Sequence, residues 1–124
     1  MSIAKKKILI VEDDKNFLWI LRQSFNEENF SVIYAMDGEA GLLLAQKESP
    51  DLIILDILLP KMDGITVAKS LKEKGVSSKI VFLTNLEDAD HISSAIAAVG
   101  ETEYIVKSDS GIDDIIARIK KKLE

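Results

Sequence analysis

The strongest structural signal in the chain is the segment Asp51–Gly64, with the sequence DLIILDILLPKMDG. Its apolar run Leu52–Leu55 lies between two aspartates, and such a short continuous run predicts a strand buried on both faces. Asp56 stands where that strand ends, and Pro60 and the Asp63-Gly64 pair mark the loop that follows. A carboxylate at the mouth of a buried strand is costly without a partner group, so other parts of the chain should supply one.

The composition limits the classes of protein to consider. The chain has 124 residues, 47% of them hydrophobic and 30% charged, which predicts one globular domain over residues 1–124. The net charge of −5 argues against nucleic acid as a direct ligand and favours a metal cation. There is no cysteine and only one histidine, His91, so thiolate and multi-histidine metal centres are excluded. The apolar run Ile8–Val11 is too short for a signal peptide or a membrane span, so we expect a cytoplasmic protein without membrane contact.

Strand and helix patterns alternate five times along the chain. Runs of β-branched and other apolar residues predict strands, and apolar residues at helical spacing predict helices. The expected strands are 7–11, 30–35, 52–55, 79–83 and 103–106, and the expected helices are 15–28, 39–48, 65–74, 88–99 and 112–123. Continuously apolar strands that alternate with helices indicate an α/β fold, in which helices cover both faces of a five-stranded parallel sheet.

Polar side chains follow four of the five expected strands. Glu12 and Asp13 follow the first strand, Asp56 the third, Thr84 the fourth and Lys107 the fifth. The carboxyl ends of parallel strands share one edge of the sheet, where open α/β folds bind ligands, so these groups should converge. Three carboxylates would repel one another without a cation between them, and magnesium prefers such oxygen ligands.

This set of groups is suited to phosphoryl transfer. The carboxylate of Asp56 can act as a nucleophile and form an aspartyl phosphate. Magnesium and Lys107 would neutralise the charge on the phosphoryl oxygens, and the hydroxyl of Thr84 could donate a hydrogen bond to the new phosphate.

At these residues the chain resembles the receiver domain of two-component response regulators, over its whole length. The matching residues are Glu12, Asp13, Asp56, Pro60, Asp63, Gly64, Thr84, Tyr104 and Lys107. The resemblance implies a flavodoxin-like fold with strand order 2-1-3-4-5. It also implies a phosphorelay function, in which the chain catalyses only its own phosphorylation and dephosphorylation. The phosphodonor would be a histidine kinase or a histidine phosphotransfer protein.

The resemblance further implies a role for each site residue. Asp56 would be the phosphoacceptor, and Mg²⁺ would be held by Glu12, Asp13, Asp56 and the backbone carbonyl of Ile57. Thr84 and Tyr104 would reorient on phosphorylation. A downstream protein or a second copy of the chain would bind the face made by the fourth helix, the fifth strand and the fifth helix.

Departures from the family pattern lead to two further expectations. Ser108 stands where proline usually follows the lysine, and a cis bond before a non-proline residue costs about 2.5–4 kcal/mol, so we expect a trans Lys107–Ser108 peptide. Leu58 and Leu86 stand where family members flank the path of an attacking water, and neither side chain can hydrogen-bond that water. With Asn85 narrowing the approach, we expect slow loss of the phosphoryl group.

Two other side chains carry predictions of position. Trp19 lies about 160° from the centre of the apolar face of the first helix, so we expect it to be exposed. Exposed aromatic residues are enriched at binding hot spots, which suggests a docking surface for the phosphodonor, although Trp19 could instead lie flat against neighbouring helices. We expect Asp14 to cap the first helix rather than to bind metal.

Three alternatives belong to other functional classes. A phosphatase with an aspartyl-phosphate intermediate would need a second aspartate two residues after Asp56, where Leu58 stands. A flavin carrier would need a phosphate-binding loop of small residues where the acidic run 12–14 stands. A degenerate receiver that acts as a phosphorylation-independent interaction module is the remaining alternative, and it should lack a key residue, whereas none is missing.

Overall fold

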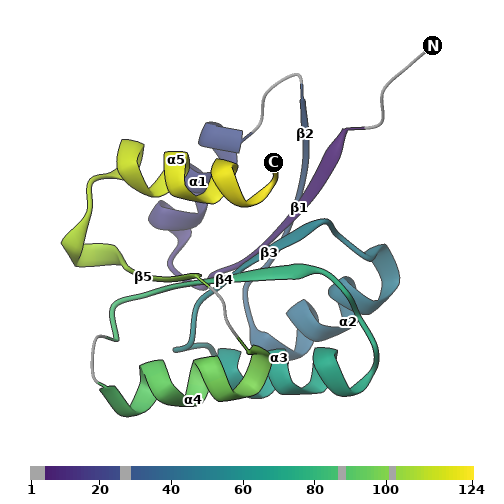
Figure 1. Cartoon of the computed structure of the whole chain (residues 1–124). Coiled ribbons are helices and arrows are strands. Elements are labelled where there is room, and N and C mark those ends of the chain that lie inside the picture. The colour runs from purple at the N-terminus through teal and green to yellow at the C-terminus, as the bar shows by residue number, and fades with distance from the viewer. Residues whose placement is uncertain (1–4, 26–28, 87–88, 101–102) are drawn as a thin grey trace.

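The computed structural model describes residues 5–25, 29–86, 89–100 and 103–124. In this part of the chain strands and α-helices alternate (Figure 1), as expected. The strands are β1 (Lys6–Val11), β2 (Phe30–Ala35), β3 (Leu52–Leu55), β4 (Lys79–Thr84) and β5 (Glu103–Val106). The helices are α1 (Lys15–Phe25), α2 (Gly38–Glu48), α3 (Gly64–Glu73), α4 (Ala89–Val99) and α5 (Ile112–Lys122), with a short 3₁₀ helix, η1 (Lys107–Asp109), after β5.

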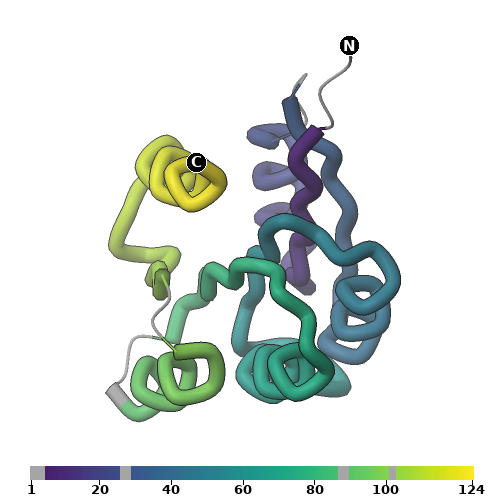
Figure 2. Tube along the Cα trace, turned by 45° about the vertical axis from the view of Figure 1, so that its right-hand side comes forward, coloured from purple at the N-terminus to yellow at the C-terminus, as the bar shows by residue number. Residues whose placement is uncertain are grey.

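The sheet has five parallel strands in the order β2-β1-β3-β4-β5, which confirms the predicted fold and strand order. Helices α1 and α5 cover one face, and α2, α3 and α4 cover the other (Figures 1 and 2). Alternate residues of one strand therefore enter different cores: Ile8 and Ile10 pack with α1 and α5, whereas Leu9 and Val11 pack with the helices of the opposite face. This is why the strands are apolar at successive positions.

The element boundaries agree closely with the sequence predictions. Apart from the end of α1, which is described to Phe25, every described helix or strand end lies within one residue of its expected position. The expected end of the first helix and the expected start of the fourth, at residues 28 and 88, lie outside the described residues. The 3₁₀ turn η1 was not predicted, because three residues are too few for a periodic pattern.

Two glycines bring the loop after β3 into close contact with the helices. A Cβ atom on Gly38, the first residue of α2, would lie 1.8 Å from the carbonyl oxygen of Met62. A Cβ atom on Gly64, at the start of α3, would lie 2.0 Å from the carbonyl oxygen of Asp56. Both helices therefore press on the backbone that follows Asp56, and that backbone is fixed from two sides.

Candidate functional site

Buried polar side chains gather at the carboxyl edge of the sheet. Among the described residues, the buried polar or charged side chains are Glu12, Asp56 and Thr84, with 2%, 6% and 0% of their surface exposed. They follow or end β1, β3 and β4, which are neighbouring strands. The predicted convergence of strand-end groups is therefore confirmed, and it accounts for every buried polar side chain in the described part of the chain.

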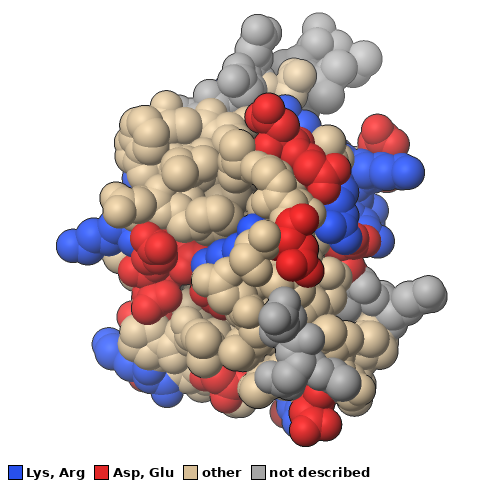
Figure 3. Space-filling view, turned by 90° about the vertical axis from the view of Figure 1, so that its left-hand side faces the viewer, with Lys and Arg blue, Asp and Glu red and all other residues tan. Residues whose placement is uncertain are grey.

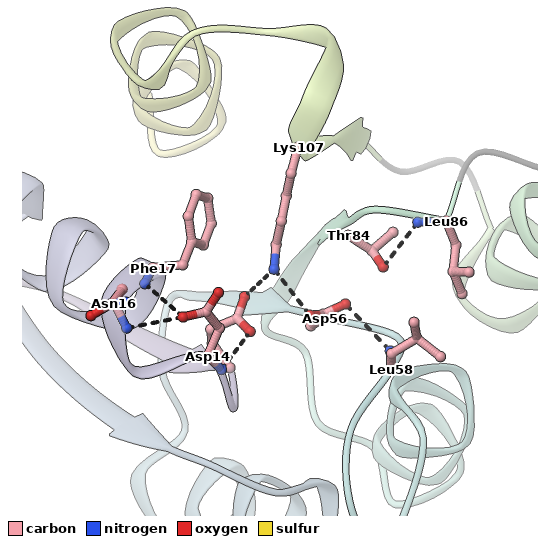
Figure 4. Close-up of polar contacts among 9 residues, drawn as sticks. Asp14, Asn16, Phe17, Asp56, Leu58, Thr84, Leu86 and Lys107 are labelled. Atoms are coloured by element: carbon pink, nitrogen blue, oxygen red, sulfur yellow. Dashed lines mark hydrogen bonds and ion pairs between the residues drawn. The ribbon is translucent and has the colours of Figure 1, made fainter.

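Lys107 joins two of these side chains (Figure 4). Its Nζ donates to Oε1 of Glu12 at 2.5 Å and to Oδ2 of Asp56 at 3.1 Å. The same Nζ lies 4.5 Å from the centroid of the Phe17 ring on α1, within the range of a cation–π contact. Burial lowers the pKa of Lys107, but its bonds to Glu12 and Asp56 outweigh burial and hold that pKa above its ordinary value. Lys107 is therefore the partner that the position of Asp56 required.

The carboxyl group of Glu12 holds its proton unusually strongly. Burial and the nearby negative charge of Asp56 raise the pKa of Glu12 from 4.5 to about 7, against the opposing effect of the bond from Lys107. The other oxygen of Glu12, Oε2, accepts the backbone N–H of Asp14 at 3.1 Å. Glu12 therefore holds its proton to higher pH than an exposed glutamate does.

The three predicted carboxylates lie close enough to share a metal ion. One oxygen from each of Glu12, Asp13 and Asp56 lies within 4.8 Å of the others. Opposite ligands of an octahedral magnesium ion, at about 2.1 Å from the metal, are about 4.2 Å apart, so a hard divalent cation would need to draw these oxygens only slightly closer together. Asp13 is exposed, which leaves one side of the group open to water and ligands. The carbonyl of Ile57 accepts the N–H of Gly64 at 2.9 Å, so one of its two lone pairs is available to a metal.

Asp14 has the capping role that the sequence predicted. Its Oδ1 accepts the backbone N–H groups of Asn16 at 3.0 Å and Phe17 at 3.3 Å, in the first turn of α1 (Figure 4). These bonds satisfy two of the N–H groups that have no partner within the helix. Asp14 therefore fixes the start of α1, directly after the acidic pair.

Thr84 and Tyr104 are linked through the backbone of Leu86. The N–H of Leu86 lies 3.4 Å from Oγ1 of Thr84, which accepts it, and the hydroxyl of Tyr104 donates to the carbonyl of Leu86 at 2.6 Å. The Tyr104 ring packs beside Phe82, with centroids 6.1 Å apart. This link was missed from the sequence, since backbone atoms carry no residue-type signal. The cation–π contact of Phe17 was missed as well, because a phenylalanine in an amphipathic helix predicts burial and gives no sign of a cation beside it.

The remaining expectations concern residues around the entrance to the site. Leu58 is 58% exposed, and its backbone N–H lies 3.3 Å from Oδ1 of Asp56. Asn85 is exposed and Leu86 is half-buried. Figure 4 shows the side chains of Leu58 and Leu86 on one side of Asp56 and the residues of α1 on the other. Both leucines therefore border the predicted approach to Asp56.

Two positional predictions are confirmed. Trp19 is 60% exposed on α1, the first helix after the acidic pair. No peptide bond among the described residues is cis, so the Lys107–Ser108 bond is trans as predicted. Figure 3 shows the edge of the molecule that carries the site, where acidic side chains lie beside basic ones in a surface of otherwise uncharged residues.

The pKa of Glu12 predicts how stability changes with pH. In the unfolded chain this carboxyl loses its proton near its ordinary value of 4.5, but in the folded protein it does so near 7. Between these values the folded state binds the extra proton, so the free energy of unfolding falls as pH rises, by up to about 3 kcal/mol. In chelator-treated protein, urea unfolding at pH 5 and pH 8 should show this loss for the wild type and not for Glu12→Gln.

The exposed Glu39 on α2 provides the matched control for that comparison. Glu39→Gln should keep the pH dependence of the wild type. If Glu12→Gln loses as much stability between the two pH values as the wild type does, Glu12 is not the titrating group.

Comparison with known proteins identifies the family to which the chain belongs. Residues 8–120 match the model of the response regulator receiver domain. The chain is 36% identical over 115 residues to the alkaline phosphatase synthesis transcriptional regulatory protein PhoP of Bacillus subtilis (strain 168), covering 93% of this chain and 47% of that protein. It is 33% identical over 116 residues to the response regulator ArlR of Staphylococcus epidermidis, covering 94% and 52%. The chain thus spans about half the length of these curated relatives.

Solved structures agree with this assignment. A CheY-like response regulator receiver domain protein from Methanospirillum hungatei is 28% identical, with a TM-score of 0.87 over 97% of this chain and 94% of that one. In the part of the chain that the structure describes, no helix combines the length and the apolar character needed to cross a membrane. The match over residues 8–120, the fold and the cluster of Glu12, Asp13, Asp56 and Lys107 agree, and the chain belongs to the receiver-domain family of two-component response regulators.

Proposed function

We propose that this chain, as a single receiver domain over residues 1–124, accepts a phosphoryl group on Asp56 with Mg²⁺ as cofactor. The donor would be a histidine kinase or a histidine phosphotransfer protein. The observation that carries the proposal is the arrangement around Asp56: a buried carboxylate, held by Lys107 at 3.1 Å, beside two further carboxylates at metal-ligand spacing.

The contacts of Asp56 support its role as the nucleophile. Lys107 binds Oδ2 and the N–H of Leu58 approaches Oδ1, so both carboxylate oxygens are oriented by donors. One of these oxygens would attack the phosphorus of a phosphohistidine as the P–N bond breaks, and the electron pair of that bond would leave with the imidazole. Lys107 is placed to neutralise charge on the transferred phosphoryl group.

Glu12, Asp13 and Asp56 would hold the metal ion. Bound there, Mg²⁺ would supply positive charge to the phosphoryl oxygens and lower the repulsion between the incoming group and the carboxylates. The binding would require loss of the proton from Glu12, whose pKa is about 7. The chemistry of the chain would be limited to its own phosphorylation and dephosphorylation.

The link between Thr84, Leu86 and Tyr104 supports a route from the site to the surface. A phosphoryl group on Asp56 would offer a charged acceptor to the O–H of Thr84, and a turn of Thr84 toward it would move the Oγ1 that accepts the N–H of Leu86 at 3.4 Å. Because the hydroxyl of Tyr104 donates to the carbonyl of Leu86, movement of the segment 84–86 would also shift Tyr104 on β5. We propose that the face of α4, β5 and α5 binds a downstream protein or a second copy of the chain.

Phosphorylation of Asp56 is tested directly by intact mass. Incubation with acetyl phosphate and Mg²⁺ should add the mass of one phosphoryl group to the wild type. No adduct should form with Asp56→Asn or when the metal is chelated, because the nucleophile or the charge neutralisation is lost. Asp109→Asn, at an exposed aspartate on η1, is the matched control and should be modified as the wild type is. An adduct that survives in Asp56→Asn would refute the assignment.

The phosphorylated form should be long-lived. Hydrolysis needs a water in line with the phosphorus, and the apolar Leu58 and Leu86 offer it no hydrogen bond. The loss of one positioned polar group commonly slows such a step about 10²-fold. Phosphate loss from purified phosphoprotein with Mg²⁺ should therefore be slow in the wild type and faster in Leu58→Asn/Leu86→Glu. Leu43→Asn, at an exposed leucine of α2, should not change the rate; a polar double variant no faster than the wild type would contradict the argument.

We also propose Trp19 as part of the docking surface for the protein phosphodonor. Truncation of a central exposed aromatic residue commonly weakens binding about tenfold or more. Trp19→Ala should therefore reduce phosphotransfer from the cognate donor at low donor concentration, while modification by acetyl phosphate stays unchanged. Leu43→Ala is the control at an equally exposed apolar residue. If Trp19→Ala is modified more slowly by acetyl phosphate to the same extent as by the protein donor, the substitution has damaged the phosphorylation site and Trp19 is not part of a docking surface.

A further inference from the structure

A cavity lies at the opposite edge of the sheet from Asp56. Its volume is about 430 Å³, within the range of small-molecule sites. It is bordered by the last turn of α3, the start of β4 and the last residues of α4 and α5. These elements begin or end at the amino edge of the sheet, so the cavity shares no residue with the phosphoacceptor site.

Three lysines from three different elements border this cavity. Lys72 lies in the last turn of α3, Lys79 is the first residue of β4, and Lys122 is the last residue of α5. The chain carries a net charge of −5, so a cavity lined by three lysines runs against its overall charge. Such a cavity attracts anions.

A carboxylate close to one of these lysines, Lys122, is largely engaged elsewhere. Glu103 on β5 pairs closely with Arg118 through Oε1, and its Oε2 lies 3.8 Å from Nζ of Lys122. Lys79 donates one hydrogen bond to the carbonyl of Lys122 at 2.7 Å, which fixes its ammonium group at the end of α5. An ammonium group has three N–H donors, so this bond leaves two of them for a ligand.

Stabilisation of helix ends explains only part of this arrangement. Lysines are favoured in the last turn of a helix, where the carbonyl groups carry partial negative charge, and that accounts for Lys72 and Lys122. It does not account for the apolar side of the cavity, which is lined by the half-buried Val76, Ile80 and Val99. Lysines that served only the helix ends would need no apolar hollow beside them.

We propose that this cavity binds a small organic anion. The three lysines would hold a phosphate or carboxylate group, and the valine and isoleucine side chains would contact an apolar body attached to it. The exposed hydroxyl-bearing residue Ser77, which also lines the cavity, adds a hydrogen-bond donor at the entrance. The site is independent of phosphorylation at Asp56.

The experiment is a ¹⁵N–¹H correlation titration of the full chain in magnesium-free buffer with three probes. Phenyl phosphate carries the anion and an apolar ring, inorganic phosphate carries only the anion, and benzyl alcohol carries only the ring. Phenyl phosphate should bind saturably, with the largest shifts at the amides of residues 76–80, and the other two probes should bind at least about tenfold more weakly, since each lacks one of the two contacts.

Two double variants locate the binding. Lys72→Gln/Lys122→Gln should weaken phenyl phosphate about tenfold, because two of the three cations are lost. Lys47→Gln/Lys121→Gln changes the net charge equally at exposed lysines that do not line the cavity and should leave the affinity unchanged. Preserved chemical shifts at the Asp56 edge verify that both variants are folded. Equal binding of benzyl alcohol, or equal affinity in the two double variants, would overturn the proposal.

Discussion

The contact of Lys107 with Glu12 and Asp56 is the interaction on which the rest of the site depends. Two carboxylates buried to 6% exposure or less would be strongly destabilising without a cation beside them. Lys107 follows β5, at the edge of the sheet, and its side chain reaches past β4 to groups at the ends of β3 and β1. One side chain thus ties together strands that share no backbone hydrogen bonds with β5. This tie fixes the geometry in which Asp56 faces its ligands.

The single ammonium group of Lys107 cannot balance the negative charge of the site. Three carboxylates against one ammonium group leave two negative charges uncompensated when all four groups are ionised. Burial and the charge of Asp56 raise the pKa of Glu12 to about 7, so a proton on Glu12 can offset part of this excess when no metal is bound. A divalent cation would carry the same compensating charge as two protons. One proton on Glu12 would still leave a net charge of −1 on these four groups, whereas a divalent cation would bring it to zero. A bound metal would therefore replace the proton on Glu12.

Particular residues show how much of this could be predicted from the sequence. The apolar run Leu52–Leu55 predicted its strand directly, because so short a continuous apolar run is typical of a buried strand. The convergence of Glu12, Asp56 and Lys107 followed from parallel topology alone. The strand order did not follow from any pattern and came from the family resemblance. The link through Leu86 was unpredictable, because its N–H and carbonyl are present in almost every residue type and only the fold selects them.

The two edges of the molecule carry opposite chemistry for a common reason. In a parallel α/β fold every helix begins near the carboxyl ends of the strands and ends near their amino ends, so the partial charges of the helix termini are segregated. Acidic residues such as Asp14, Asp37 and Asp63 accept N–H groups where α1, α2 and α3 begin. Lysines such as Lys72 and Lys122 occupy the last turns. The same backbone arrangement that favours carboxylates at one edge therefore favours ammonium groups at the other, and an apolar hollow beside those lysines is what the proposed anion site adds to their role at the helix ends.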